Sequence, residues 1–74
     1  MTYYDAKTKI LPYAIFRHFK GNLYEVLAIA QHSETNEPMV IYQDIEKRGI
    51  TWARPASMWF DEVNDGIKRF ERCQ

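Results

Sequence analysis

The sequence has one cysteine, three glycines and three prolines among 74 residues, and it has no long apolar run. A single cysteine excludes an internal disulfide, and we expect the near-terminal Cys73 to be inert because fixed neighbours that lower a thiol pKa are lacking there. The apolar stretches are far shorter than the ~18 residues of a membrane span, so no membrane segment is expected. Ten basic residues balance ten acidic ones. No overall field therefore draws the chain toward nucleic acid or an anionic membrane.

Aromatic residues are abundant instead. They make up 15% of the chain, within an apolar fraction of 46%. Large rings bury much area per residue, which partly offsets the small share of surface that so short a chain can bury. We therefore expect one folded domain. The start, 1–5, lacks the basic and apolar regions of a secretory signal, which predicts a cytoplasmic location.

Short strands separated by turn residues are predicted along most of the chain. The expected elements are strands at 13–19, 23–32, 39–43 and 50–54, one helical turn at 55–60, and a last strand at 67–72. The run 23–32 has the length of a strand and is bracketed by Gly21-Asn22 and the polar turn 33–38, which favours a strand over a helix. We expect the first two strands to pair and 23–32 to form a hairpin with 39–43.

The predicted strand 23–32 carries apolar residues on both faces. Strict alternation places Tyr24, Val26 and Ala28 on one face, and Leu27 and Ile29 on the other. A strand covered on both sides for part of its length has this pattern. The expected cover is the N-terminal segment or a helical turn.

The first 12 residues show no clean period of two or 3.6 residues. We expect a tail that packs on the domain through Tyr3, Tyr4 and Ile10. The chain is thus divided into an N-terminal extension, 1–12, and a single domain, 13–74. Five short strands in so few residues predict a mainly β fold: a small five-stranded barrel, of SH3 or OB type, with a short helical turn before the last strand.

Four segments of the chain resemble a known family in their order and spacing. They are Arg17–Leu27, Ala30–Thr35, Val40–Tyr42 and Trp52–Pro55, the last followed by Met58. They resemble the bacterial family catalogued as domain of unknown function 1653, over about residues 13–70. The resemblance implies an SH3-type barrel and no particular reaction. Ala53 and Trp59 depart from the family pattern, in which a larger aliphatic residue and a phenylalanine are common.

Polar and aromatic residues near the predicted strand ends form the candidate site. They are His18, His32, Glu34, Thr35, Tyr42, Trp52 and Arg54. An imidazole can act as a base or a donor near neutral pH, although a histidine bonded within a turn is the more frequent case. Extended backbone before Pro55 holds Arg54 in a fixed direction, where it can grip a carboxylate or phosphate, or pair with Glu34 or Asp61.

Catalysis and metal binding receive little support from these residue types. The spacing of His18, His32 and Glu34 matches no compact metal-ligand motif. Adjacent residues of an extended chain point to opposite sides, so His32, Ser33 and Glu34 form no catalytic relay. We expect no catalytic residue, no metal and no cofactor.

The preferred interpretation is a non-enzymatic binding module that recognises a peptide, a nucleic acid or a small ligand. Its expected contact surface is Tyr42, Trp52 and Arg54 together with the turn 32–35. Zero net charge counts against nucleic acid, since it removes much of the salt-dependent affinity.

Two other functions stay open. In one, a small enzyme or ligand-sensing domain uses His18 or His32, tuned by Glu34, to move a proton. In the other, the protein is a structural homodimer that buries its exposed aromatic residues against a second copy. Another protein or a single-stranded nucleic acid is the candidate partner of the binding module.

Overall fold

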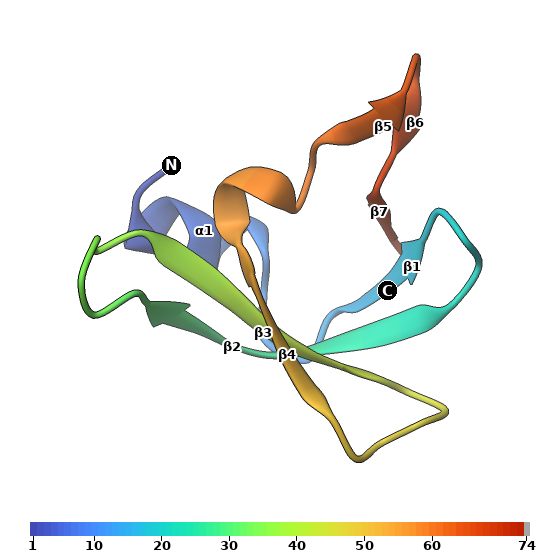
Figure 1. Cartoon of the computed structure of the whole chain (residues 1–74), viewed down its shortest axis with the longest axis horizontal. Helices are drawn as coiled ribbons and strands as arrows, with labels where there is room; N and C mark the ends of the chain where they lie inside the picture. The colour runs from blue at the N-terminus through green and yellow to red at the C-terminus, as the bar shows by residue number, and fades with distance from the viewer. Residues whose placement is uncertain (74) are drawn as a thin grey trace.

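The computed structural model describes residues 1–73 and contains a curled antiparallel sheet, one helix and a small second hairpin (Figure 1). The chain is mainly β, as predicted. The elements in order are α1 (Tyr3–Lys9), β1 (Ile15–His18), β2 (Leu23–Gln31), β3 (Pro38–Asp44), β4 (Thr51–Pro55), the 3-10 turn η1 (Ala56–Met58), β5 (Glu62–Asn64), β6 (Ile67–Lys68) and β7 (Phe70–Arg72).

The main sheet has five strands in the order β4-β3-β2-β1-β7, and all neighbours are antiparallel. The predicted hairpin is confirmed as β2–β3, and the predicted pairing of the first two strands is confirmed as β1–β2. A separate hairpin joins β5, which was not predicted, to β6. Its turn contains Gly66 at φ 75°, a backbone angle that glycine adopts without steric cost.

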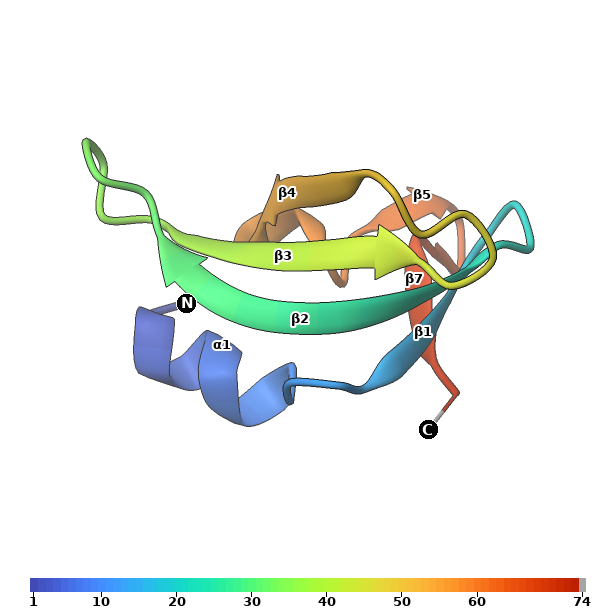
Figure 2. The same cartoon turned by 90° about the horizontal axis from the view of Figure 1, so that it is seen from below.

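The predicted closure of the strands into a barrel is not observed. β4 and β7 are the edges of the main sheet, and no strand pairing joins them within residues 1–73. Figure 2 shows the curl of the sheet, which turns β7 steeply across the direction of β2 and β3. The predicted last strand is divided because Arg69 leaves the ladder: its N–H donates to the Asp61 carbonyl, and its own carbonyl accepts from the Phe19 N–H.

A β-bulge at Leu27 interrupts β2. Val26 pairs with Tyr42, but Ala28 pairs with Ile41, the next residue along β3. One extra residue on β2 shifts the alternation of its side chains. Strict alternation is therefore wrong beyond this point, and Val26 and Ile29, although three residues apart, are both buried. The bulge explains why apolar residues occupy both even-numbered and odd-numbered positions of this strand.

The N-terminal segment, expected to be a tail or cap that packs on the domain, contains a short helix. Thr2 and Asp5 form a capping box, in which each side chain accepts a hydrogen bond from the backbone N–H of the other. The helix packs against β2 and β3 with Ala6 and Ile10 fully buried (Figure 2). The predicted contact through Ile10 is confirmed, whereas Tyr4 is 77% exposed and its predicted contact is wrong.

Aromatic rings dominate the core beneath the concave face of the sheet. Trp59, Phe16 and Phe70 are the largest fully buried side chains. The rings of Trp59 and Phe70 are stacked, with 3.9 Å between centroids and 7° between planes. In the segment after Pro55, Trp59 is fully buried, whereas Met58 is exposed. This ring cluster supports residues that line a pocket on the concave face.

Candidate functional site

A pocket of about 200 Å³ opens on the concave face of the main sheet. Side chains of a strand alternate between the two faces of a sheet, so each strand can send selected residues to this side. Every strand of the main sheet contributes: one residue comes from each of β1, β2, β3 and β7, and two come from β4. The lining residues of this concave pocket are His18, Tyr24, Tyr42, Trp52, Arg54 and Phe70.

Strand register brings the lining residues together. Tyr42 pairs with Trp52 across β3 and β4, and His18 pairs with Phe70 across β1 and β7. The ring centroids of Tyr24 and Tyr42 lie 5.4 Å apart, and those of Tyr42 and Phe70 lie 5.8 Å apart. Tyr42 and Trp52, two residues of the expected contact surface, are therefore cross-strand neighbours. Because the rings pack on each other, the walls are held without a ligand.

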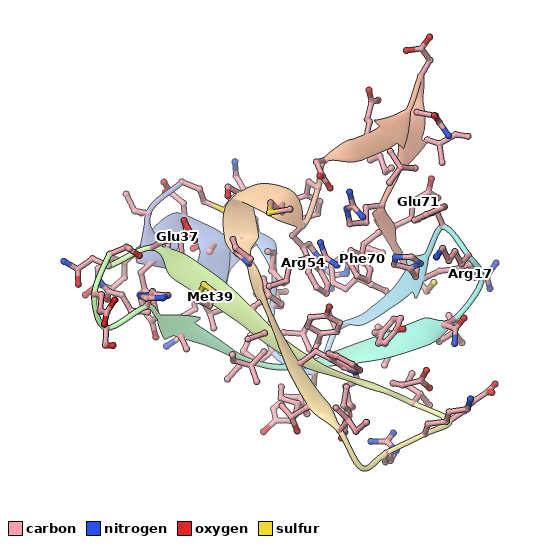
Figure 3. All side chains as sticks on the ribbon, in the orientation of Figure 1. Arg17, Glu37, Met39, Arg54, Phe70 and Glu71 are labelled. Atoms are coloured by element: carbon pink, nitrogen blue, oxygen red, sulfur yellow. The ribbon has the colours of Figure 1, made fainter. Side chains whose placement is uncertain are left out.

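Arg54 is the unusual member of the pocket. Its Nε is buried without a hydrogen-bond partner in the described residues, and its guanidinium carbon lies 5.8 Å from the centroid of the Phe70 ring (Figure 3). Neither expected partner, Glu34 or Asp61, forms an ion pair with it within residues 1–73; Asp61 pairs with Arg69 at 2.9 Å. A buried donor without an acceptor costs about 1–3 kcal/mol.

His18 lies beside Arg54 in a positive environment. Burial lowers the pKa of His18, and the charges of Lys20, Arg54 and Arg69 lower this pKa further. The backbone N–H of Lys20 donates to His18 Nδ1 at 3.2 Å. A neutral imidazole bonded in this way carries its proton on Nε2. Positive charge thus gathers at the pocket of a protein whose net charge is zero.

The acidic residue nearest to the pocket tyrosines is Asp44, at the end of β3. Burial raises the pKa of Tyr24, and the Asp44 carboxylate raises this pKa further. The backbone N–H groups of Lys47 and Glu46 and the Asn22 amide all donate to Asp44, and these bonds lower the pKa of its carboxyl. Asp44 therefore organises the loop after β3.

The other three predicted site residues lie in the turn between β2 and β3. The backbone N–H groups of Glu34 and Thr35 donate to His32 Nδ1 at 3.2 and 3.4 Å, and Thr35 Oγ1 accepts from the Glu37 N–H. This turn forms the tip of the β2–β3 hairpin, and Figure 3 shows its Glu37 apart from Arg54, although Arg54 pairs with Val40 toward the same end of β3. His32 thus accepts two hydrogen bonds from the backbone of its own turn. None of the three lines the concave pocket.

A second cavity of about 230 Å³ also includes His18. Its lining residues are Arg17, His18, Phe19, Ile67, Lys68 and Glu71. Its basic residues are exposed, and none of its polar side-chain atoms is both buried and unpartnered in the described residues. It therefore lacks the unsatisfied donor that distinguishes the concave pocket.

Metal-ligand clusters and membrane-spanning helices are both absent from the described residues. Within residues 1–73, no three histidine, cysteine or acidic side chains gather closely enough to hold a metal ion. The one α-helix described, α1, has seven residues, too few to cross a bilayer. Cys73 is exposed, and its Sγ lies 3.8 Å from the Glu71 carbonyl oxygen.

Two pocket residues, Tyr24 and Phe70, are missing from the predicted site. Tyr24 lies two residues before the buried Val26, on the same face of β2. The alternation of residues in the sequence therefore does indicate that Tyr24 faces the pocket side. Phe70 reaches the pocket through the pairing of β7 with β1, which joins residues about 50 positions apart. No local pattern in the sequence indicates that contact.

The fold and the pocket define a small, mainly β protein whose curled sheet carries an aromatic pocket with one unpaired guanidinium. A family model described as a protein of unknown function, DUF1653, matches residues 14–72, and the chain belongs to this family. A crystal structure of a protein of that family from Bordetella bronchiseptica is similar, with 28% identity, a TM-score of 0.69, and coverage of 84% of this chain and 86% of that chain. No curated protein matches the chain.

Proposed function

We propose that the protein is a non-enzymatic binding module whose concave pocket receives a negatively charged group joined to a flat or apolar one. The observation that carries this proposal is the Arg54 guanidinium, whose buried Nε lacks an acceptor among the aromatic rings of the pocket. A guanidinium offers a planar fork of donors that matches a carboxylate or a phosphate. The ligand would bond to the outer donors of a guanidinium for which the described protein groups provide no ion-pair partner.

The size and walls of the pocket narrow the ligand further. About 200 Å³ is below the roughly 300–1,000 Å³ of sites that enclose a whole small molecule. The pocket therefore suits one side chain or one terminal group of a larger ligand. Trp52 is 48% exposed and stands at the rim, where its ring can cover an incoming flat group.

Binding accounts for the site better than proton transfer does. A catalytic histidine usually has a carboxylate that orients its ring, and among the described residues none bonds to His18. Its Nδ1 already accepts the Lys20 N–H, and its depressed pKa keeps it neutral near physiological pH. His18 then serves as a neutral donor at Nε2.

A titration followed by ¹⁵N NMR tests the proposal. The probes are N-acetyl-tyrosine, its uncharged amide, and uridine monophosphate as the phosphate-bearing alternative. We expect the N-acetyl-tyrosine carboxylate to shift the resonances of β4 and the Trp52 indole, and the amide to bind at least fivefold more weakly. Arg54→Gln should weaken carboxylate binding at least fivefold, because it removes the charge and the fork.

Arg17→Gln is the matched control. Arg17 precedes His18 on β1, so its side chain leaves the opposite face of the sheet, and it is exposed. We expect this variant to bind the probe within twofold of wild type. The proposal is wrong if Arg54→Gln folds normally and binds N-acetyl-tyrosine as tightly as wild type does.

A further inference from the structure

One edge of the main sheet is free beside the concave pocket. β4 pairs with β3 on one side, and within residues 1–73 no other backbone hydrogen bond uses Thr51–Pro55. The first three residues of β4 are exposed. The same strand carries Trp52 and Arg54 of the pocket. The free backbone edge and the unpaired guanidinium therefore lie on one element.

The hydrogen bonds of the neighbouring strands show which groups of β4 face outward. The Ile45 N–H donates to the Leu23 carbonyl, so the backbone of residue 45 bonds toward β2. Successive residues of an antiparallel strand bond alternately to one neighbouring strand and the other. Gln43, two residues from Ile45, therefore bonds toward β2, and Tyr42 bonds toward β4. Val26, the partner of Tyr42 across β2 and β3, indeed bonds to residues 13 and 14 on its other side. Tyr42 therefore bonds to its partner on β4, residue 52.

The outward groups of β4 follow from this pairing. Trp52 and Arg54 direct their N–H and carbonyl groups toward β3, so Thr51 and Ala53 direct theirs to the free edge. A strand added there would place its own residues opposite Trp52 and Arg54 in non-hydrogen-bonded pairs. Cα atoms are only about 4.5 Å apart in such pairs, and their side chains share a face. Side chains of the added strand would therefore enter the concave pocket.

We infer that the partner is an extended peptide that adds to the edge of β4 and places a carboxylate against Arg54; this inference rests on the proposed function. Alternating N–H and carbonyl groups at Thr51 and Ala53 match another polypeptide strand, and a polynucleotide has no such pattern. Arg54 and Lys20, whose charges act on His18 and which form no ion pair within residues 1–73, complement an acidic peptide. The same charge opposes edge pairing with a second copy of this chain, which would bring like charges together.

The carboxylate has two sources in a peptide, an acidic side chain and the C-terminus. The probe is a fluorescein-labelled hexapeptide of threonine and valine, with tyrosine and aspartate two residues apart so that both enter the pocket. Fluorescence anisotropy is measured with a free-acid and an amidated C-terminus, and with asparagine replacing aspartate. Loss of affinity with asparagine assigns the side chain, and loss with the amidated peptide assigns the C-terminus.

Ala53→Pro separates edge pairing from pocket binding. Proline removes the outward N–H of residue 53 but no donor to β3, and an edge strand tolerates it there. We expect at least a tenfold loss of hexapeptide affinity with N-acetyl-tyrosine binding retained. Peptides N-methylated at successive residues test the same bond from the ligand side, which covers a failure of Ala53→Pro to fold. Methylation at alternate positions should weaken binding at least tenfold, and methylation at the positions between should change it less than twofold.

Each other outcome has a distinct meaning. If Arg54→Gln weakens binding but neither Ala53→Pro nor N-methylation does, strand addition is overturned and the proposed function stands. If Arg54→Gln binds every probe as tightly as wild type does, both the peptide inference and the proposed function are wrong. Tight binding of a uridine hexanucleotide without hexapeptide binding overturns the peptide class. Sedimentation tests a second copy of the chain as the partner. If the chain self-associates, Ala53→Pro abolishes this association and the hexapeptide does not compete with it, the peptide inference is overturned in favour of a second copy.

Discussion

The two histidines of the chain lie in contrasting regions of the molecule. At the tip of the β2–β3 hairpin, His32 accepts two backbone N–H groups, and the turn around it satisfies its own donors. On the concave face, His18 stands among aromatic rings next to Arg54, whose buried Nε has no acceptor in the described residues. Both regions contain the residue types of a site. Among the described residues, the concave face contains a buried donor without an acceptor and the turn contains none.

The largest expected effect comes from the ring cluster beneath the pocket. Trp59→Ala removes a fully buried ring that stacks on Phe70, and it should lower the free energy of unfolding by about 3–5 kcal/mol. Urea denaturation measures the change. Trp59→Phe is the control and should cost less, because it keeps an aromatic ring and removes the unpartnered buried Nε1. Near-wild-type stability of Trp59→Ala would show that the pocket does not depend on this cluster.

Trp52→Ala should separate binding from folding. Its ring is 48% exposed, so we expect the free energy of unfolding to change by less than about 1 kcal/mol. Binding of N-acetyl-tyrosine should weaken about three- to tenfold, because an aromatic contact contributes roughly 0.5–1.5 kcal/mol. NMR titration and thermal unfolding measure the two effects. Tyr13→Ala, which removes an exposed ring outside the pocket, should leave the affinity unchanged.

Lowering the pH should weaken the fold and strengthen anion binding through His18. Because the folded-state pKa of His18 is depressed, the unfolded state binds more protons near the ordinary pKa of 6.5. This contribution to stability is present above 6.5 and is lost as the pH falls through the folded-state pKa. Protonated His18 adds positive charge beside Arg54, Lys20 and Arg69, so carboxylate affinity should rise over the same range.

Two variants assign this pH dependence. His18→Gln should remove most of the change in unfolding midpoint and in probe affinity between pH 7.5 and 5.5. His32→Gln should retain both changes. If His32→Gln removes them and His18→Gln does not, the roles given to the two histidines are reversed.

The smallest expected effect belongs to the turn. His32→Ala removes the acceptor of two N–H groups at an exposed site and should cost about 1 kcal/mol of stability or less. Affinity for N-acetyl-tyrosine and for the hexapeptide should not change. A threefold or larger loss of affinity would place the turn 32–35 within the binding surface after all.

The strands of this protein are largely predictable from its sequence, because Gly21-Asn22 and the turn 33–38 bracket a run of strand length. The helix α1 is harder to predict because only Ala6 is buried within its seven residues, which is too little for a visible period. The bulge at Leu27 is also difficult to predict from the sequence. A strand with one extra residue and a strand buried on both faces both have apolar residues at odd and even positions.

The candidate site is predictable in part for a related reason. Tyr42, Trp52 and Arg54 lie on two strands joined by a short loop, so their adjacency follows from local pairing. Phe70 and His18 meet through β7 and β1, and the sequence contains no local sign of that pairing. The residues 32–35 look like a site because turns and sites use the same polar residue types.

Pro55, at the end of β4, limits the number of partner residues that can pair with this edge. Proline donates no backbone hydrogen bond, and the chain turns into η1 immediately after it. The usable edge is therefore Thr51–Arg54, only four residues long. A partner motif of that length allows little selectivity for sequence and binds weakly by itself. Such motifs arise in unrelated proteins by a few substitutions, so recognition through this edge would be broad unless several motifs act together.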